Sequence, residues 1–128
     1  MRLLLDTHAL LWWSAGDPQL SAAAREAIPD RRNEVWVSAA SAWEIAAQQR
    51  LGRLPPLAAD AKAFGHLRAA AGFELLPVSA AHAWQVGAMA DANRDPFDRM
   101  LAAQSEIEQL VPVTRDPAFA ALQTHTLW

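Results

Sequence analysis

Short apolar runs alternate along the chain with longer segments in which apolar and polar residues are mixed. Four runs have the length and the aliphatic composition of buried strands: Leu3–Leu5, Val35–Val37, Phe73–Val78 and Leu110–Thr114. A short run that is apolar at nearly every position is typical of a strand covered on both faces. The pattern therefore predicts a buried sheet built from these runs.

Helices are expected between the runs, because each intervening segment has helix-forming residues and a start or stop signal. Ser21 and Ser79 are suitable N-cap residues, and Ser41 with Glu44 three residues later fits a capping box. An additional edge strand is expected over Thr126–Trp128. The expected helices span residues 9–14, 22–28, 39–50, 60–71, 80–90, 96–103 and 119–122.

Strands that alternate with helices predict an α/β fold with a mostly parallel central sheet. Parallel strands need crossover connections, and the helices in those connections cover both faces of the sheet. The chain has 128 residues, of which 52% are hydrophobic. That length is enough for one substantial core and too short for two, so we expect a single domain over residues 1–128.

Four acidic residues lie where a strand-like run ends or a helix begins. In an α/β fold these positions converge at one edge of the sheet. Carboxylates held close together must share protons, meet basic partners or bind a cation. Lys62, the only lysine, is far in sequence from all of them, which favours Mg²⁺, with Mn²⁺ as a substitute. The four acids are Asp6, Glu44, Asp98 and Asp116.

Each acid also has a purely structural interpretation. Asp6 could cap the helix that follows it, and Glu44 could be the acidic half of the capping box. Asp95 and Asp98 compete for one role, because Asp95 is suited to cap its helix and Asp98 would interact well with the helix dipole. Asp116 could cap the short helix that follows. The sequence leaves open whether Asp95 or Asp98 would be the direct ligand.

Composition excludes several classes of site. The chain has no cysteine, which rules out disulfides, thiol nucleophiles and thiolate zinc sites, and its four histidines lack paired ligand spacing. No apolar stretch approaches the roughly 20 residues of a membrane span, and Asp6 interrupts the first apolar run too early for a signal peptide. We therefore expect a cytoplasmic protein without a membrane partner.

Charge argues against a protein that coats nucleic acid through bulk attraction, because the formal net charge is −3. Local arginine patches remain compatible with this charge. Arg94, Arg99 and Arg115 crowd the acidic segments, and Arg50 and Arg53 form another cluster. The six tryptophans are expected mainly in the core, although such rings can stack RNA bases.

Four blocks of residues together resemble the PIN domain of VapC-type toxins. Their order and spacing, and the length of the chain, fit that family from end to end. One block alone would be a weak signal, whereas four in register are specific. The blocks are Asp6-Thr7-His8-Ala9-Leu10-Leu11-Trp12-Trp13, Ser41-Ala42-Trp43-Glu44-Ile45, Arg94-Asp95-Pro96-Phe97-Asp98-Arg99-Met100-Leu101-Ala102-Ala103-Gln104 and Val113-Thr114-Arg115-Asp116.

This resemblance implies a three-layer PIN-like fold and a Mg²⁺-dependent single-strand ribonuclease, the toxin of a type II toxin–antitoxin pair. Matched by motif, Asp6, Glu44, Asp98 and Asp116 would be its acidic quartet. Asp6, Asp98 and Asp116 would hold one or two metal ions, and Glu44 would bond through water. The metal-activated water would then hydrolyse an RNA phosphodiester. Asp95 would be a cap or would support the ligands.

The resemblance also implies partners: an RNA substrate, a cognate antitoxin and a second copy in a homodimer. From its own position in the chain, Thr114 could hydrogen-bond a carboxylate or a metal-bound water, or simply end a strand. Arg94, Arg99 and Arg115 would contact the RNA or the antitoxin, with a salt bridge to Asp95 as the simpler role of Arg99. The sequence does not identify the RNA target, the number of metal ions, the antitoxin or the oligomeric state.

Two residues depart from the family pattern. Asn93 stands where a histidine commonly precedes Arg-Asp-Pro, and Ser105 stands where alanine commonly follows Ala-Ala-Gln. Neither replaces an acid, so both bear on the preference for a substrate or partner more than on activity.

Two functions from other classes compete with the nuclease. A phospho-acceptor signalling domain also gathers acids around Mg²⁺ on a doubly wound sheet, but it needs a lysine after its last strand. Here Arg115 and Asp116 follow that strand. A catalytically inert PIN-like interaction module would be expected to lose one or more acids, and all four are present.

Overall fold

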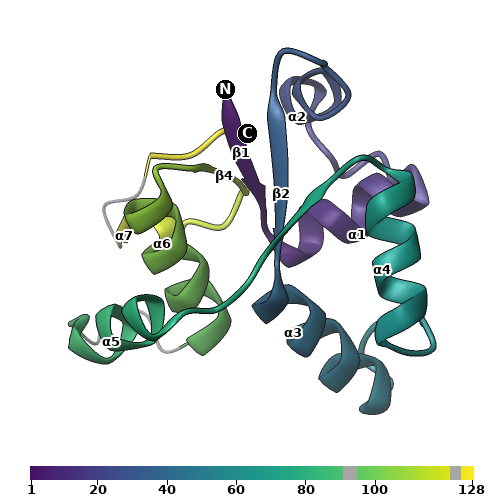
Figure 1. The fold of residues 1–128 in the computed structure, drawn as a ribbon. Helices are drawn as coiled ribbons and strands as arrows, with labels where there is room; N and C mark the ends of the chain where they lie inside the picture. Colours follow the sequence, from purple (N-terminus) through teal and green to yellow (C-terminus); the bar gives the residue numbers. More distant parts are fainter. Residues whose placement is uncertain (91–94, 122–124) are drawn as a thin grey trace.

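A four-stranded parallel sheet forms the centre of the molecule (Figure 1). The computed structural model describes residues 1–90, 95–121 and 125–128. The strands are β1 (Arg2–Leu5), β2 (Glu34–Ser38), β3 (Glu74–Leu76) and β4 (Val111–Val113), and their order in the sheet is β3-β2-β1-β4. The expected parallel α/β sheet is therefore confirmed.

The register brings the carboxyl ends of the two central strands and of β4 to one level. Leu5 at the end of β1 lies opposite Val37 of β2 and Val113 of β4. The residues that follow these strands therefore emerge at the same edge of the sheet. Ligand sites of open parallel sheets form at this edge.

Helices cover both faces of the sheet, as the strand–helix alternation predicts. Leu3 and Leu5 of β1 pack into a core with residues of α1, α2, α3 and α4, whereas Leu4 packs with residues of α6 and α7. This division follows from the two-residue period of a strand. The helices are α1 (Thr7–Ala15), α2 (Ala22–Ala27), α3 (Ala39–Arg50), α4 (Ala61–Ala70), α5 (Ala80–Ala88), α6 (Pro96–Glu108) and α7 (Ala118–Ala121).

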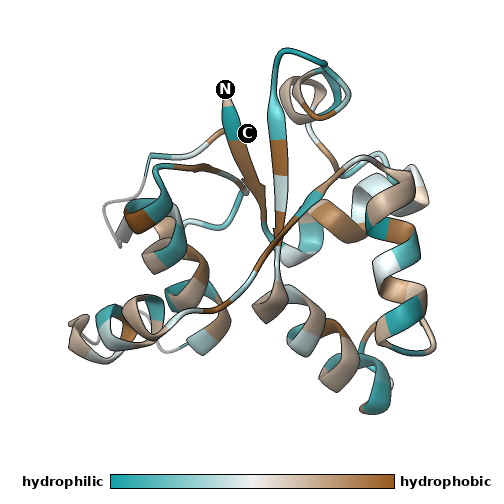
Figure 2. Ribbon diagram, viewed as in Figure 1, coloured by the Kyte–Doolittle hydropathy of each residue, from teal (hydrophilic) through white to brown (hydrophobic). Residues whose placement is uncertain are grey.

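Hydrophobic residues follow the buried parts of the central strands (Figure 2). The three leucines of β1 are completely buried. Edge strand β4 contains Pro112, whose missing N–H is tolerated at a sheet edge. In the ranges that the structure describes, no helix is long and apolar enough to cross a membrane.

Some element boundaries differ from those expected. The third strand is shorter than the expected Phe73–Val78, because only Glu74–Leu76 pair with β2. The segment Thr126–Trp128 does not form a strand, and Leu127 makes a single bridge to Val113. Helix α1 begins at Thr7 rather than at Ala9, because the Asp6 side chain caps it.

Candidate functional site

Asp6 ends β1 and caps α1, so its carboxylate lies at the edge where the strands finish. The Ala9 N–H donates to Asp6 Oδ1 at 2.7 Å, and the side chain is 8% exposed. Burial raises the pKa of Asp6, and the negative charge of Asp116 raises it further. The hydrogen bonds from Thr114 and Ala9 and the nearby His8 act in the opposite direction but do not outweigh burial.

Thr114 links two of the predicted acids. It follows β4 and is almost completely buried. Its side chain hydrogen-bonds the carboxylate of Asp6, and its hydroxyl oxygen accepts from the backbone N–H of Asp116 at 3.0 Å. Asp116 in turn accepts from the N–H of Ala118, the first residue of α7, at 2.9 Å. The end of β4 therefore holds Asp116 in place beside Asp6.

Glu44 is not part of a capping box, which corrects the expectation from the sequence. Helix α3 begins directly after β2, so Ser38 is its N-cap and accepts from the Ala40 N–H at 3.0 Å. Ser41 consequently lies inside the helix, where it is buried. The Glu44 carboxylate instead accepts a hydrogen bond from the hydroxyl of Thr7. Its orientation thus comes from α1 and not from its own helix.

The environment of Glu44 disfavours its ionised form. Burial is the largest cause of its raised pKa, and the charges of Asp95 and Asp6 raise that pKa further. The bond from Thr7 opposes these effects by stabilising the carboxylate. Glu44 therefore lies within electrostatic reach of acids at the end of β1 and at the start of α6.

The start of α6 carries Asp95 and Asp98. Asp95 is the N-cap, and its Oδ1 accepts from the N–H of Phe97 at 2.9 Å and of Asp98 at 3.4 Å. Asp98 lies in the first turn and is half-buried. The α6 acid whose charge raises the pKa of Glu44 is Asp95. Asp95 thus combines a capping role with a place beside the other acids.

The acids gather at one edge of the sheet without forming a closed set of ligands. Electrostatic effects connect Asp6 with Asp116, Asp6 with Glu44, and Glu44 with Asp95. Within the described part of the chain, no group of three or more His, Asp or Glu side chains is close enough to hold a metal ion. The donors fit Mg²⁺ chemically, because all are carboxylate oxygens whose mutual repulsion a hard cation would relieve.

Sequence reasoning missed Thr7, which orients Glu44 and lies 3.2 Å from the hydroxyl of Ser41. It also missed the bond from Ser38 to Gln104 Oε1, which is 2.6 Å long and joins the start of α3 to α6. Thr7 and Glu44 are 37 positions apart, and Ser38 and Gln104 are 66 apart. The position of Thr7 directly after Asp6 was the only available signal.

The three predicted arginine contacts differ in their surroundings. Arg94 lies outside the described residues. Arg99 is half-buried, and its Nη2 donates to the carbonyl oxygens of Val86 at 3.0 Å and Met89 at 3.5 Å, which ties α6 to the end of α5. Arg115 is exposed, with its guanidinium carbon 4.5 Å from the centroid of the Trp12 ring.

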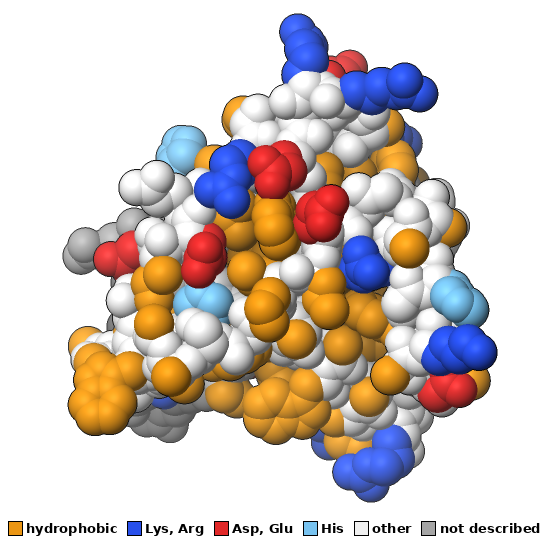
Figure 3. All heavy atoms as spheres, in the orientation of Figure 1, with side chains coloured by type: hydrophobic (Ala, Val, Ile, Leu, Met, Phe, Trp, Pro, Cys, Tyr) orange, Lys and Arg blue, Asp and Glu red, His pale blue; other side chains and the backbone are white. Residues whose placement is uncertain are grey.

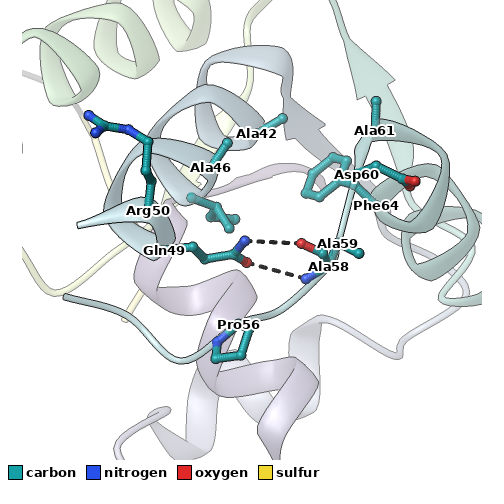
Figure 4. Close-up of a pocket in the computed structure, with 11 residues that line it drawn as sticks. Ala42, Ala46, Gln49, Arg50, Pro56, Ala58, Ala59, Asp60, Ala61 and Phe64 are labelled. Atoms are coloured by element: carbon teal, nitrogen blue, oxygen red, sulfur yellow. Dashed lines mark hydrogen bonds between the residues drawn. The ribbon is translucent and has the colours of Figure 1, made fainter. Parts of the chain in front are cut away.

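A separate groove of about 510 Å³ lies between α3, α4 and the loop that joins them (Figure 4). Gln49 closes the floor of this groove with bonds to the backbone N–H and carbonyl of Ala58. None of the four predicted acids lines it. The groove is therefore distinct from the acidic edge of the sheet.

Comparison with known families decides the classification, because the PIN domain model matches residues 3–124. The chain belongs to the PIN domain family. The resemblance inferred from the four sequence blocks is thereby confirmed, and the parallel sheet with flanking helices is the PIN-like fold.

Individual relatives are consistent with this classification. A segment of 43 residues is 54% identical to ribonuclease VapC16 of Mycobacterium tuberculosis (strain ATCC 25618 / H37Rv), and it covers 30% of this PIN domain chain and 30% of that protein. Two solved structures share the fold over nearly the whole chain. The first is VapBC2 from Rickettsia felis bound to a promoter DNA fragment, with a TM-score of 0.64 and 16% identity. The match covers 100% of this chain and 98% of the VapBC2 chain.

The second structure is FitAcB from Neisseria gonorrhoeae, with a TM-score of 0.61 and 22% identity. The match covers 98% of this chain and 96% of that chain. At this level of identity, both structures support the fold of the PIN domain and do not assign its substrate.

Proposed function

We propose that this PIN domain is a metal-dependent single-strand endoribonuclease and the toxin of a toxin–antitoxin pair. The observation that carries the proposal is the convergence of carboxylates at one edge of the sheet, at the end of β1, on α3, at the start of α6 and after β4. Burial is the largest cause of the raised pKa values of Asp6 and Glu44, and the charges of neighbouring acids add to it. Family membership, the likeness to a protein named ribonuclease VapC16, and the shared fold with a VapBC complex support it.

In this proposal Asp6, Asp98 and Asp116 hold Mg²⁺, and Glu44 bonds to it through water, with Mn²⁺ as a substitute. When bound, the ion would activate a water molecule and stabilise the charge that develops on the scissile phosphate. The side chains of Thr7 and Thr114 keep Glu44 and Asp6 in fixed orientations by donating hydrogen bonds to them.

Asp95 maintains the first turn of α6, on which Asp98 lies. Its charge also adds to the negative field at the site, since it raises the pKa of Glu44. Both effects favour cation binding at this edge of the sheet. Asp95 is thus a positioning residue in this scheme, and Asp98 is the proposed ligand.

Arg115 is the arginine best suited to contact RNA or an acidic segment of the antitoxin. It directly precedes Asp116, and no ion pair between described residues involves it. The Trp12 ring and the Gln19 Oε1, 3.2 Å from its Nη2, hold the guanidinium in place. Arg94 is proposed for the same role from sequence, whereas the carbonyl contacts of Arg99 leave it a mainly structural one.

The proposed partners are RNA, a cognate antitoxin and a second copy of the chain, in the cytoplasm. The names of the VapBC2 and FitAcB structures motivate the antitoxin. For a homodimer, Leu75 in edge strand β3 and Val78 just after it are 43% and 42% exposed, and Figure 3 shows hydrophobic side chains gathered on one face of the molecule. A second copy would remove such surface from water.

The alternatives are an inert PIN-like interaction module and, with less support, a phospho-acceptor domain. The second requires a lysine beside the acids, and the only lysine, Lys62, lies on the surface of α4. For the first, the protein would bind partners through the same fold without cleaving RNA. The presence of the complete acidic quartet favours the nuclease.

Purified protein incubated with single-stranded and structured RNA, in Mg²⁺, Mn²⁺ or EDTA, tests this proposal. We expect cleavage of single strands that requires metal and is lost in Asp6→Asn and Asp98→Asn. Glu26→Gln on α2 removes an exposed acid far from the site in sequence and serves as the control. Equal cleavage by all variants would indicate a contaminating nuclease, and the absence of cleavage and of metal binding in calorimetry would favour the inert module.

A further inference from the structure

Trp43 is an exposed indole beside the acidic edge. It directly precedes Glu44 on α3, yet 66% of the residue is accessible to solvent. Trp43 and Trp84 are exceptions to the expectation that the tryptophans lie mainly in the core, because the other four pack against it. A single exposed apolar side chain is common on protein surfaces. Trp43 is distinguished by its place in the chain directly before Glu44 and by the contact that fixes its ring.

The ring of Trp43 has a defined orientation. Its centroid is 4.9 Å from that of Phe97, and the two planes meet at 73°, which is an edge-to-face contact between α3 and α6. Phe97 is the residue before Asp98. Trp43 and Phe97 thus bridge the two helices at the positions adjacent to two of the proposed active-site acids. An indole held in this way offers a pre-oriented surface for a planar ligand.

The same face of α3 ends in a cation. Arg50 is seven residues after Trp43, two helical turns away and about 10.5 Å along the axis. Between them on this side of the helix lie the small side chains of exposed Ala46 and half-buried Ala47. Arg50 is exposed, and no ion pair between described residues involves it. An aromatic ring near the acids and a free cation further along match the two features of a single strand, its bases and its phosphates.

We propose that the stripe of α3 from Trp43 to Arg50 is a binding track for single-stranded RNA that leads away from the acidic site. A base next to the cleaved position stacks on the indole of Trp43, and a phosphate further along the strand contacts Arg50. This inference rests on the proposed function for the site itself. The position of the aromatic pair favours RNA over a second copy of the chain as the occupant. Trp43 and Phe97 directly precede Glu44 and Asp98, so a strand whose base stacks on the indole has its phosphates beside the proposed active-site acids.

The test measures RNA affinity separately from cleavage. A fluorescent single-stranded oligoribonucleotide in EDTA reports the dissociation constant by anisotropy, across a series of salt concentrations. We expect Trp43→Ala to weaken binding about tenfold without a change in the salt dependence, because stacking is not ionic. Trp43→Phe should restore most of the affinity. Arg50→Ala should lower the slope of log K against log salt by about 0.7, as expected for one lost phosphate contact.

Two matched controls separate the track from general effects. Trp84→Ala on α5 removes an indole that is 84% exposed, and Arg31→Ala removes an exposed arginine that precedes β2, at the opposite end of the sheet. Both should bind RNA as the wild-type protein does. A series of RNAs, each with one base replaced by an abasic residue, adds a further test. The wild-type protein should bind more weakly when the abasic residue is at one particular position, and Trp43→Ala should bind that RNA as tightly as the intact one.

The outcomes separate this inference from the proposed function. Cleavage by the wild-type protein with equal RNA affinities in Trp43→Ala and Trp84→Ala would retain the nuclease and reject the track. RNA binding that depends on Trp43 and Arg50, without cleavage, would retain the track and reject the nuclease. A change of molar mass in light scattering of Trp43→Ala, with unchanged RNA affinity, would reject the track and assign Trp43 to an interface between copies.

Discussion

The hydroxyl of Thr7 is expected to control the ionisation of Glu44, and Thr7→Val tests this directly. Valine has nearly the shape of threonine but cannot donate the hydrogen bond that Glu44 accepts. A hydrogen bond to a charged group contributes about 1.5–3 kcal/mol, and one between neutral groups about 0.5–1.5 kcal/mol. We therefore expect a loss of about 1.5–3 kcal/mol in the free energy of unfolding at neutral pH and a smaller loss in acid.

The pH dependence has a defined sign. The pKa of Glu44 in the folded protein is already raised by burial, and the bond from Thr7 opposes that shift. Its removal raises the pKa further. Because the folded state then retains its proton to higher pH than the unfolded chain, stability falls as pH rises from about 4.5, the ordinary value, through the folded value. This fall should be larger in Thr7→Val than in the wild-type protein.

Urea denaturation in EDTA at a series of pH values measures this effect without reference to activity. Thr7→Ser is the matched control, since it keeps the hydroxyl and loses only a methyl group. If Thr7→Val and Thr7→Ser had the same free energy of unfolding at every pH, the assigned role of the hydroxyl would be refuted. If the nuclease requires ionised Glu44, the acid limb of the pH–rate profile should also move to higher pH in Thr7→Val alone.

Three further outcomes are expected. Asp6→Asn should abolish cleavage but raise the free energy of unfolding at pH 7 in EDTA by about 0.5–2 kcal/mol. The reason is that asparagine still caps α1, while the substitution removes a buried charge whose pKa is raised. Lower stability of this variant in urea melts would contradict the prediction. Gln104→Ala should lower the free energy of unfolding by about 1–3 kcal/mol, and a double-mutant cycle with Ser38→Ala should give a coupling energy of at least about 0.5 kcal/mol, because the two side chains share a buried hydrogen bond. Additive effects of the two substitutions would contradict this coupling. Mg²⁺ at 100 times its Kd should stabilise the wild-type protein by about 2.7 kcal/mol in thermal melts, and EDTA should reverse the gain; an equal gain in Asp6→Asn would place the ion elsewhere.

Local sequence signals predicted much of the fold. The four strands, the parallel sheet and the caps at Ser21 and Ser79 all follow from patterns within a few residues, and the structure has each of them. The capping box at Ser41 was wrong for an equally local reason. Ser38 is also a good N-cap, and the choice between the two serines depends on where β2 ends against its neighbours.

The placement of acids at strand and helix ends was readable from the sequence, because strand ends and helix starts are local features and parallel strands finish at one edge. Which acids influence one another was not readable. The charge of Asp95 at Glu44 and the bond from Thr7 to the same carboxylate arise between elements that meet only after folding.

The sequence by itself thus determined the class of fold, the order of its elements and the edge at which the acids lie, because hydrophobic periodicity and capping act over one or two turns. Only the tertiary structure decided how those acids are oriented and that the Trp43 ring remains exposed beside Phe97. The physical reason is that side-chain hydrogen bonds and ring contacts require positions within a few ångströms. Packing of α1, α3 and α6 around the sheet sets those positions, and no local pattern encodes it.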